Sequence, residues 1–267
     1  MPELPEVEVT RRAIRPYVEG RRIDSITYVP GKVVNCDGRP SFRDALLGCA
    51  IDVVERKGKW MRMTTDGDYD MYVHLGLSGN LAVGPYPQAN SIMALYLEDG
   101  TTVSYVDQKG YGHVIAHDHA KPFERWEELG PDALEDDVTA ERLSKAFAKS
   151  RRAVKVALMD QTLVSGLGNT YVAEILFLAG ISPKRRCRDL EPDEIDRLAQ
   201  TIRPYLTYVT DIVWSQVTDP TGLHSEGIAP YLNVYGREGQ VCNGCWGTVE
   251  SCMQSGRKSY FCPDCQK

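Results

Sequence analysis

The stretch that fixes the C-terminal part of the fold is Cys242-Asn-Gly-Cys245, followed after sixteen residues by Cys262-Pro-Asp-Cys265. Two Cys-x-x-Cys turns at this spacing supply four sulfur ligands in a tetrahedron, and the segment between them can double back as a hairpin. We therefore predict a zinc ribbon that holds one zinc ion. The zinc is expected to be structural, because four thiolates leave no coordination position for water. Two redox-active pairs are the alternative, which is disfavoured because neither pair precedes a convincing helix.

The composition of the whole chain is that of a folded protein large enough for two domains. Of its 267 residues, 42% are hydrophobic and 25% are charged, which argues against disorder. The sequence has no run of about 18 apolar residues, and its N-terminal segment carries charges where a signal peptide needs an apolar stretch. We expect a cytoplasmic protein without membrane contact, in which the eight cysteines are reduced or bound to metal.

The formal net charge of −6 by itself disfavours nucleic-acid binding, because phosphate contacts require clustered Lys and Arg. The distribution of the charges changes this conclusion. Acidic residues gather in 124–141 and 189–196, whereas basic residues form two groups: Lys149, Arg151, Arg152 and Lys155, and Lys184, Arg185, Arg186 and Arg188. One face of the molecule is therefore expected to be acidic and another basic.

Local patterns predict one helix and then a β-rich region up to residue 118. Apolar residues recur at near-helical spacing from about residue 5 to 19, and Gly20 is a typical helix stop. Short stretches rich in β-branched and aromatic residues follow, separated by turn signals at Asp66-Gly67 and Asp99-Gly100. The segment 119–136 combines Pro, Gly and many acids without periodicity, and we interpret it as a linker.

Helical signals dominate after this linker. Leu143 and Phe147, and then 154–159, indicate two helices. A Ser-Gly-Leu-Gly interruption precedes a third helix, which should begin at Asn169 and end at Ala179-Gly180. A fourth helix is expected from about residue 192 to 217, and the remainder of the chain is rich in turns.

The N-terminus offers a second chemical feature. Removal of Met1 would leave Pro2 with a free secondary amine, and an α-amino pKa of about 7.7–8.0 keeps a useful fraction neutral at pH 7. Such an amine can attack C1′ of a sugar and form an iminium, with Glu3 moving the protons. Taken alone this hypothesis is weak, because proline is also an ordinary residue near a helix N-terminus.

Five separated segments together resemble one family. The start Met1-Pro-Glu-Leu-Pro-Glu-Val-Glu8 and the cysteine cluster enclose His74-Leu-Gly-Leu-Ser-Gly79, Leu158-Met-Asp-Gln-Thr-Leu-Val-Ser-Gly-Leu-Gly-Asn169 and Val234-Tyr-Gly-Arg237. With these segments the chain resembles the formamidopyrimidine-DNA glycosylase and endonuclease VIII family, and it is more similar to the first branch. A zinc-ribbon module for protein interaction is a competing interpretation, but it would explain only the C-terminal segment.

The resemblance implies an α+β fold of two domains. A catalytic β-sandwich with an N-terminal helix would occupy 1–118, a hinge 119–136, a helical domain with a helix-two-turn-helix 137–231, and a zinc-finger hairpin 232–267. Damaged double-stranded DNA would lie between the domains of a monomer, which would be associated with the nucleoid in a bacterium. No redox cofactor is implied.

The resemblance also implies a bifunctional DNA glycosylase and AP lyase of base excision repair. Pro2 would be the nucleophile that forms a Schiff base, Glu3 the general acid and base, and Glu6 a further carboxylate of the active site. Lys59 matches a hairpin lysine near the lesion and Lys155 a lysine close to the active site, although each would otherwise be interpreted as a solvated surface charge. A non-catalytic protein that binds damaged DNA and retains the fold is the alternative.

Three more residues match phosphate contacts of the family. Asn169 would begin a helix whose first free N–H groups face an anion, although helix capping alone also explains it. Arg257 matches the arginine of the zinc hairpin that grips phosphates beside the extruded nucleotide, and it is otherwise an ordinary hairpin charge. His74 would contact phosphate, with a satisfied core histidine as the alternative.

The residues that would fill the gap left by a flipped base depart from the family pattern. The methionine after His-Leu-Gly is Leu77 here, and the arginine and phenylalanine of Asp-Pro-Arg-Arg-Phe-Gly are Lys109 and Tyr111, with Gly110 replacing the second arginine. The segment 219–230 is shorter than the family loop that closes over 8-oxoguanine. The lesion could therefore be 8-oxoguanine, a ring-opened purine, an oxidised pyrimidine or a bulky adduct, and we expect weak dependence on the opposite base.

Overall fold

The computed structural model describes residues 2–38, 40–217 and 228–267. The chain divides into two compact units, which we call the sandwich unit (Met1–Glu128 with Val213–Glu226) and the helical unit (Leu129–Ile212 with Gly227–Lys267). Among the described residues, no helix combines the length and the apolar character needed to cross a membrane.

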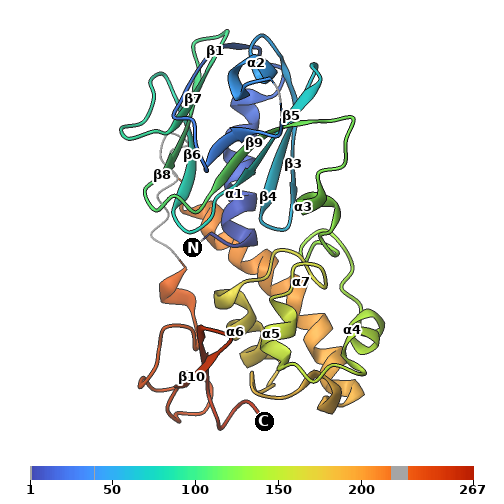
Figure 1. Cartoon of the computed structure of the whole chain (residues 1–267). Helices are drawn as coiled ribbons and strands as arrows, with labels where there is room; N and C mark the ends of the chain where they lie inside the picture. Colours follow the sequence, from blue (N-terminus) through green and yellow to red (C-terminus); the bar gives the residue numbers. More distant parts are fainter. Residues whose placement is uncertain (1, 39, 218–227) are drawn as a thin grey trace. The chain divides into compact units, whose positions relative to one another are not determined.

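The sandwich unit contains two β-sheets and, among its helices, α1 (Leu4–Val18) and α2 (Phe42–Leu46), with α1 starting and ending within one residue of the predicted helix (Figure 1). Both turn signals are confirmed, because Asp66-Gly67 lies between β4 (Trp60–Thr65) and β5 (Tyr69–His74), and Asp99-Gly100 lies between β7 (Met93–Leu97) and β8 (Thr102–Asp107). The four-stranded sheet has the order β1 (Ile23–Tyr28), β7 (Met93–Leu97), β8 (Thr102–Asp107) and β6 (Gly79–Gly84). The five-stranded sheet has the order β2 (Val34–Cys36), β9 (His113–Asp118), β5 (Tyr69–His74), β4 (Trp60–Thr65) and β3 (Ile51–Lys57).

The core of the sandwich unit joins both sheets to one face of α1. Val7, Ile14 and Val18, which follow the spacing of a helical apolar stripe, are buried in the same cluster as Leu81 and Val114 from the two sheets. The segment 119–136 is not entirely irregular, because it contains the short helix α3 (Glu124–Glu127), which the sequence patterns did not predict. So short a helix leaves no periodic signal in the sequence.

The helical unit contains the predicted helices. These are α4 (Ala140–Phe147), α5 (Val154–Leu158), α6 (Asn169–Leu178) and α7 (Pro192–Ser215, of which Val213–Ser215 belong to the sandwich unit), with 3-10 turns η1 (Cys187–Asp189) and η2 (Ala229–Tyr231). Gly180 follows α6 with a φ of 71°, a left-handed conformation that suits glycine after a helix end.

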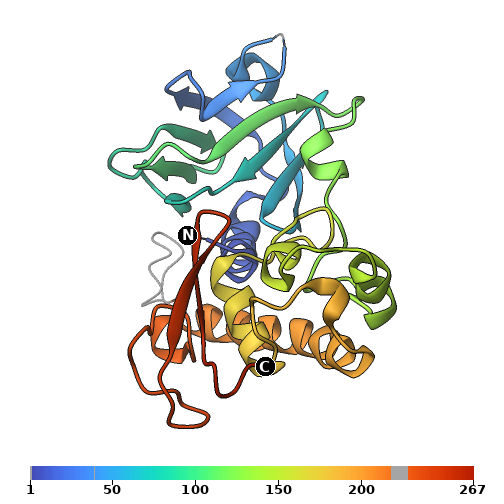
Figure 2. The same ribbon diagram turned by 60° about the horizontal axis from the view of Figure 1, so that its bottom comes forward.

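A two-stranded hairpin, β10 (Glu250–Gln254) and β11 (Arg257–Phe261), completes the helical unit. Figure 2 shows the hairpin beside α6, and contacts between α6 and β11 support this placement. Ser255 and Gly256, with φ of 46° and 73°, form its turn, as the twist of a two-residue hairpin turn requires.

Candidate functional site

The N-terminal segment brings Pro2, Glu3 and Glu6 together at the start of α1. Glu3 precedes the helix with only 1% of its surface exposed, and its backbone N–H donates to Glu6 Oε2 at 2.8 Å. This bond fixes the direction in which the chain enters the helix. Because the N-terminal end of a helix carries partial positive charge, both carboxylates lie where negative charge is stabilised.

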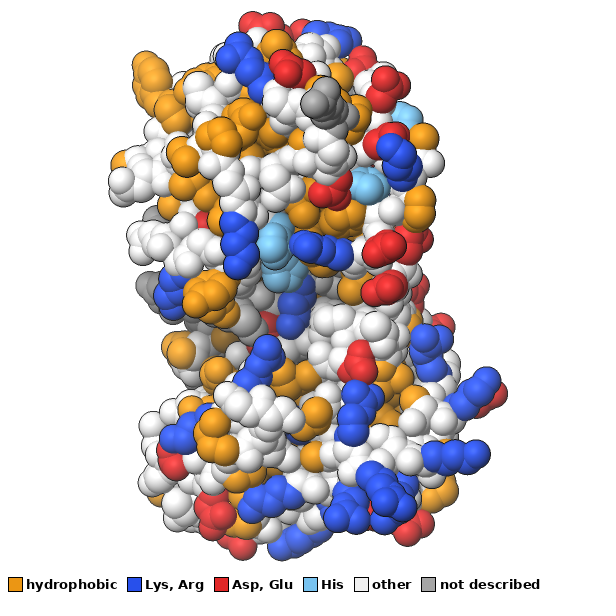
Figure 3. Space-filling view, viewed as in Figure 1, with side chains coloured by type: hydrophobic (Ala, Val, Ile, Leu, Met, Phe, Trp, Pro, Cys, Tyr) orange, Lys and Arg blue, Asp and Glu red, His pale blue; other side chains and the backbone are white. Residues whose placement is uncertain are grey.

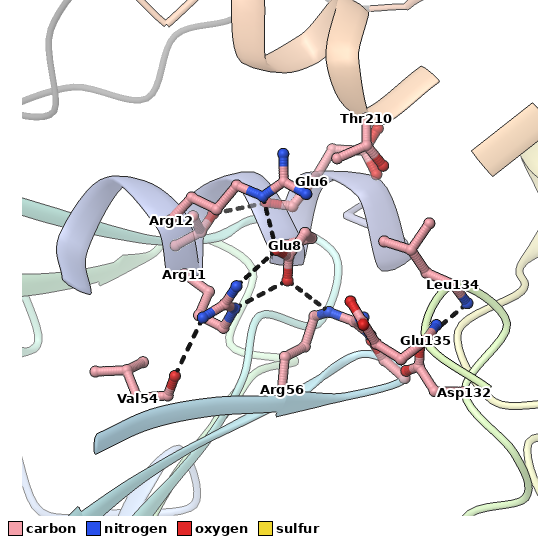
Figure 4. Close-up of polar contacts among 12 residues, drawn as sticks. Glu6, Glu8, Arg11, Arg12, Val54, Arg56, Asp132, Leu134, Glu135 and Thr210 are labelled. Carbon is pink, nitrogen blue, oxygen red and sulfur yellow. Dashed lines mark hydrogen bonds and ion pairs between the residues drawn. The ribbon is translucent and has the colours of Figure 1, made fainter. Parts of the chain in front are cut away.

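One turn further along α1, Glu8 forms a buried ion cluster that the sequence patterns did not single out (Figure 4). Its carboxylate accepts hydrogen bonds from Arg11 at 2.8 and 2.9 Å, from Arg12 at 2.7 Å and from Arg56 of β3 at 2.9 Å. Burial alone would raise the pKa of Glu8, but the three guanidinium groups lower it to about 2. The cluster therefore ties α1 to β3 through a charged contact.

Lys59 and His74 lie near each other in the sandwich unit. Lys59 belongs to the turn between β3 and β4, and His74 ends β5, where its ring packs against Trp60 with centroids 4.9 Å apart. Burial, and then the positive charge of Lys59, lower the pKa of His74 to about 4. His74 Nδ1 accepts the N–H of Gly76 at 3.1 Å. The ring is therefore neutral at pH 7 with its proton on Nε2, a donor suited to a phosphate oxygen.

The three residues expected to fill a gap in DNA lie on two adjacent loops of the same unit. Leu77 is 39% exposed and Tyr111 is 60% exposed, and Lys109 is also at the surface. The loops touch, since a Cβ at Gly76 would lie 2.5 Å from the Tyr111 carbonyl.

In the helical unit, Lys155 and Asn169 differ from what their residue types alone suggested. Lys155, on α5, is 1% exposed, so its interpretation as a solvated surface charge is wrong. Asn169 begins α6 as expected, but Gly168 occupies the N-cap position. Helix capping therefore does not explain Asn169, whose Nδ2 donates to the carbonyl of Lys258 at 3.0 Å. This bond links the start of α6 to β11 of the hairpin.

Arg257 is exposed directly after the turn of the hairpin, and its neighbour Lys258 forms an ion pair with Glu238. The two basic groups of the sequence also meet in this unit, because Cys187 N donates to Arg152 O at 3.0 Å and Val154 N to Arg185 O at 2.8 Å. Figure 3 shows Lys and Arg side chains gathered low on the face in view, with acidic side chains among them. Figure 3 shows only one face, so the expectation of one acidic and one basic face stays a prediction.

The four cysteines of the ribbon converge as their spacing predicted. Their sulfur atoms all lie within 4.8 Å of one another, with Cys242 Sγ 3.8 Å from Cys265 Sγ and Cys245 Sγ 3.4 Å from Cys262 Sγ. A tetrahedron with metal–sulfur bonds of about 2.3 Å has edges of about 3.8 Å, so this cluster fits a zinc ion. Gly244 N–H donates to Cys242 Sγ at 3.3 Å, which stabilises a thiolate.

Comparison with known proteins accounts for most of the chain. Residues 1–114 match the formamidopyrimidine-DNA glycosylase N-terminal domain, 129–215 the formamidopyrimidine-DNA glycosylase H2TH domain, and 239–267 the zinc finger found in FPG and IleRS. The chain belongs to the formamidopyrimidine-DNA glycosylase family. It is therefore a DNA repair protein of the glycosylase type with a C-terminal zinc finger, and the family resemblance and the α+β fold expected from the sequence are confirmed.

Individual relatives match along their full length. The formamidopyrimidine-DNA glycosylases of Laribacter hongkongensis and Paracoccus denitrificans are 36% and 34% identical to this chain, with 100% of each chain covered. Among solved structures, Lactococcus lactis Fpg in complex with DNA containing an abasic site aligns with a TM-score of 0.88 at 28% identity. MutM in complex with DNA containing carbocyclic 8-oxo-G aligns with a TM-score of 0.87 at 28% identity, and both alignments cover 100% of each chain.

One further residue of this glycosylase family member escaped the sequence analysis. Glu174 of α6 is fully buried, and its carboxylate accepts the backbone N–H groups of Asn233, Val234 and Tyr235 at 2.7–2.9 Å. It thereby attaches the Val234-Tyr-Gly-Arg237 segment to α6. A single acid within the apolar run 171–178 was a signal that could have identified it, because an unpaired buried carboxylate is costly.

The predicted site residues thus fall into two groups, each placed within its own unit. Pro2, Glu3, Glu6, Lys59, His74 and the loop residues Leu77, Lys109 and Tyr111 belong to the sandwich unit, and Lys155, Asn169, Arg257 and the four cysteines belong to the helical unit. Most of the segment 219–230, whose shortness bears on the choice of lesion, lies outside the described residues.

Proposed function

We propose that this glycosylase excises a damaged base from double-stranded DNA and then nicks the abasic site by β,δ-elimination. The observation that carries the proposal is the arrangement at the start of α1. Pro2 is followed directly by the buried Glu3, whose N–H is held by Glu6 at 2.8 Å. With Met1 removed, the Pro2 amine and a fixed carboxyl group would lie side by side.

The chemistry follows from these two groups. The neutral Pro2 nitrogen donates its electron pair to C1′ while the glycosidic bond breaks and the base departs with the bonding pair, and the proton that the Pro2 nitrogen then loses neutralises the departing base. Glu3 donates a proton to the sugar ring oxygen, so that the ring opens and the Pro2 nitrogen and C1′ become an iminium. Transfer of a C2′ proton to the Glu3 carboxylate then expels the 3′ phosphate, and loss of a C4′ proton expels the 5′ phosphate in a second elimination. Hydrolysis of the iminium regenerates the amine.

Cations and amides would hold the DNA backbone during these steps. Lys59 and the Nε2–H of the neutral His74 would contact phosphates from the sandwich unit, and the start of α6 and Arg257 from the helical unit. Structures of relatives in complex with DNA support the binding of DNA by this chain. A structural zinc ion in the thiolate cluster would keep the hairpin folded and so present Arg257, without taking part in the reaction.

Borohydride reduction tests the mechanism, because an iminium between Pro2 and C1′ becomes a stable amine that links protein to DNA. We expect the processed protein to be trapped on a duplex with an abasic site, and Pro2→Gly to weaken trapping. Glu3→Gln should impair base excision more than nicking of an abasic site, because excision has the greater need of a proton donor. Absence of trapping with the processed protein would refute the mechanism.

The matched control keeps Pro2 but blocks its amine. A glycine inserted between Met1 and Pro2 converts the proline nitrogen into an amide, which cannot form an iminium, while every side chain remains. This protein should bind the duplex and not be trapped. If the natural protein keeps Met1, as intact mass would reveal, and binds without trapping, it acts instead as a non-catalytic binder of damaged DNA.

The lesion is identified by a panel of oligonucleotides. Duplexes with 8-oxoguanine, a ring-opened purine, an oxidised pyrimidine and a bulky adduct should be compared in single-turnover cleavage, each opposite all four bases. The replacement of family residues by Leu77, Lys109 and Tyr111 favours a preference that differs from that of the family members with the usual residues.

A further inference from the structure

Hydrogen bonds from two different loops converge on one buried carboxylate, that of Asp107 at the end of β8. Ser78 Oγ donates to Asp107 Oδ1 at 2.6 Å, Lys109 N–H to the same oxygen at 3.2 Å, and Gly112 N–H to Oδ2 at 2.7 Å. Lys109 N–H also reaches Ser78 Oγ at 3.0 Å. Asp107 is 7% exposed, and its bond with Gly112 is buried. The carboxylate therefore joins the loop 75–78 to the loop 108–112.

The backbones of the two loops are packed too closely to admit side chains. A Cβ at Gly112 would lie 1.8 Å from the hydroxyl oxygen of Tyr105, and a Cβ at Gly79 would lie 2.3 Å from the same atom. Gly76, with a φ of 62°, touches the Tyr111 backbone. Both loops thus rest on Tyr105, whose ring is fully buried.

Apart from these contacts, the tip of the loop 108–112 lies at the surface. Gln108, Lys109, Gly110 and Tyr111 are all exposed, and a side chain at Gly110 would meet no atom of the described residues within 4 Å. Gly110 has a φ of 67° and is conformationally permissive, and Gln108 stands where the family pattern has a proline that would stiffen the chain. The conformation of this loop therefore depends on the bonds to Asp107.

We propose that Asp107 and Ser78 form a clamp that presents Leu77, Lys109 and Tyr111 to DNA as one rigid element and thereby sets the preference for damaged over intact duplex. The inference rests on the proposed function, because it takes these three side chains as the ones that enter the duplex. Asp107 and Ser78 are positioning residues, which act through the exposed side chains. A preorganised element does not lose loop entropy when it enters the duplex, whereas a mobile one does.

The first measurement tests the clamp independently of any activity. Hydrogen–deuterium exchange of the full-length zinc-loaded protein should be about tenfold faster in 107–112 for Ser78→Ala and for Asp107→Asn. The first change removes a hydroxyl donor from the network, and the second removes one carboxylate oxygen. Ser78→Thr, which keeps the hydroxyl, should restore slow exchange. Asp99→Asn is the matched control, since Asp99 also binds a backbone N–H and an arginine, at the β7–β8 turn. It should leave 107–112 unchanged.

The second measurement is the ratio of affinities for a duplex with a non-cleavable abasic-site analogue and for the same intact duplex. We expect Ser78→Ala and Asp107→Asn to lower this ratio about tenfold, Ser78→Thr to restore it, and affinity for intact duplex to stay constant. Unchanged exchange in 107–112 overturns the clamp, and faster exchange with an unchanged ratio overturns its role in selectivity. A wild type that shows the preference but is not trapped by borohydride refutes the catalytic mechanism alone. If Asp107→Asn does not fold, the exchange rate and the affinity ratio of Ser78→Ala alone test the clamp.

Discussion

Removal of the Glu8 carboxylate should destabilise the sandwich unit more than removal of any exposed acid. In Glu8→Gln a neutral amide replaces the carboxylate that pairs with Arg56, whose side chain is 1% exposed. Breaking a buried ion pair by removal of one partner costs about 3–5 kcal/mol. The pKa of Glu8 gives a second value for this free energy. Its fall from 4.5 to about 2 corresponds to about 3 kcal/mol of stabilisation of the charged form. The two values agree at about 3 kcal/mol.

The pH dependence carries a definite sign. Because the pKa of Glu8 is lower in the folded protein than in the unfolded chain, the stabilisation is complete above about pH 4.5 and is lost as the pH falls towards 2. Glu8→Gln should therefore be less stable than the wild type at pH 7, and the difference should shrink as the pH approaches 2.

The assay is urea unfolding, monitored through hydrogen exchange of the β3 and β4 amides. These amides report on the sandwich unit and not on the zinc cluster. Glu55→Gln is the control, since Glu55 neighbours Arg56 on β3 but is 46% exposed and pairs with Arg62 at 3.6 Å. An exposed pair contributes less than about 1 kcal/mol. If Glu8→Gln costs no more than Glu55→Gln, the reasoning from a buried ion cluster is wrong.

Four further outcomes are expected. The His74 pKa of about 4 lies below its usual 6.5, so protonation of the unfolded chain should destabilise the protein as the pH falls from 6.5 to 4, and His74→Gln should remove that component from urea midpoints. Cys262→Ser should release metal in a chelator-based assay and disorder the hairpin while the sandwich unit stays folded, and loss of both units together would contradict a local role. Arg257→Ala should retain zinc and make the salt dependence of DNA affinity shallower by about one unit, with an unchanged slope counting against a phosphate contact. Lys109→Arg should raise selectivity for cytosine opposite the lesion, because a guanidinium makes a bidentate contact that an ammonium cannot, and such a contact discriminates by roughly 5- to 150-fold. Strong cytosine selectivity in the wild type that Lys109→Arg leaves untouched would show that another residue contacts the orphaned base.

The sequence by itself determined the features that depend on neighbours along the chain. The apolar spacing before Gly20 located α1, the Asp-Gly pairs located two hairpin turns, and the two Cys-x-x-Cys turns defined the metal cluster. In each case the pattern and the structure it specifies span a few residues, so periodicity and turn chemistry suffice.

Only the tertiary structure decided which charged and polar groups meet across long separations. Arg56 lies 48 positions from Glu8, Lys258 lies 89 positions from Asn169, and Ser78 lies 29 positions from Asp107. It also buried Lys155, which from its type alone belongs at the surface. A hydrogen bond or an ion pair has no sequence period, because its partner is chosen by the packing of whole elements, and that packing exists only when the chain has folded.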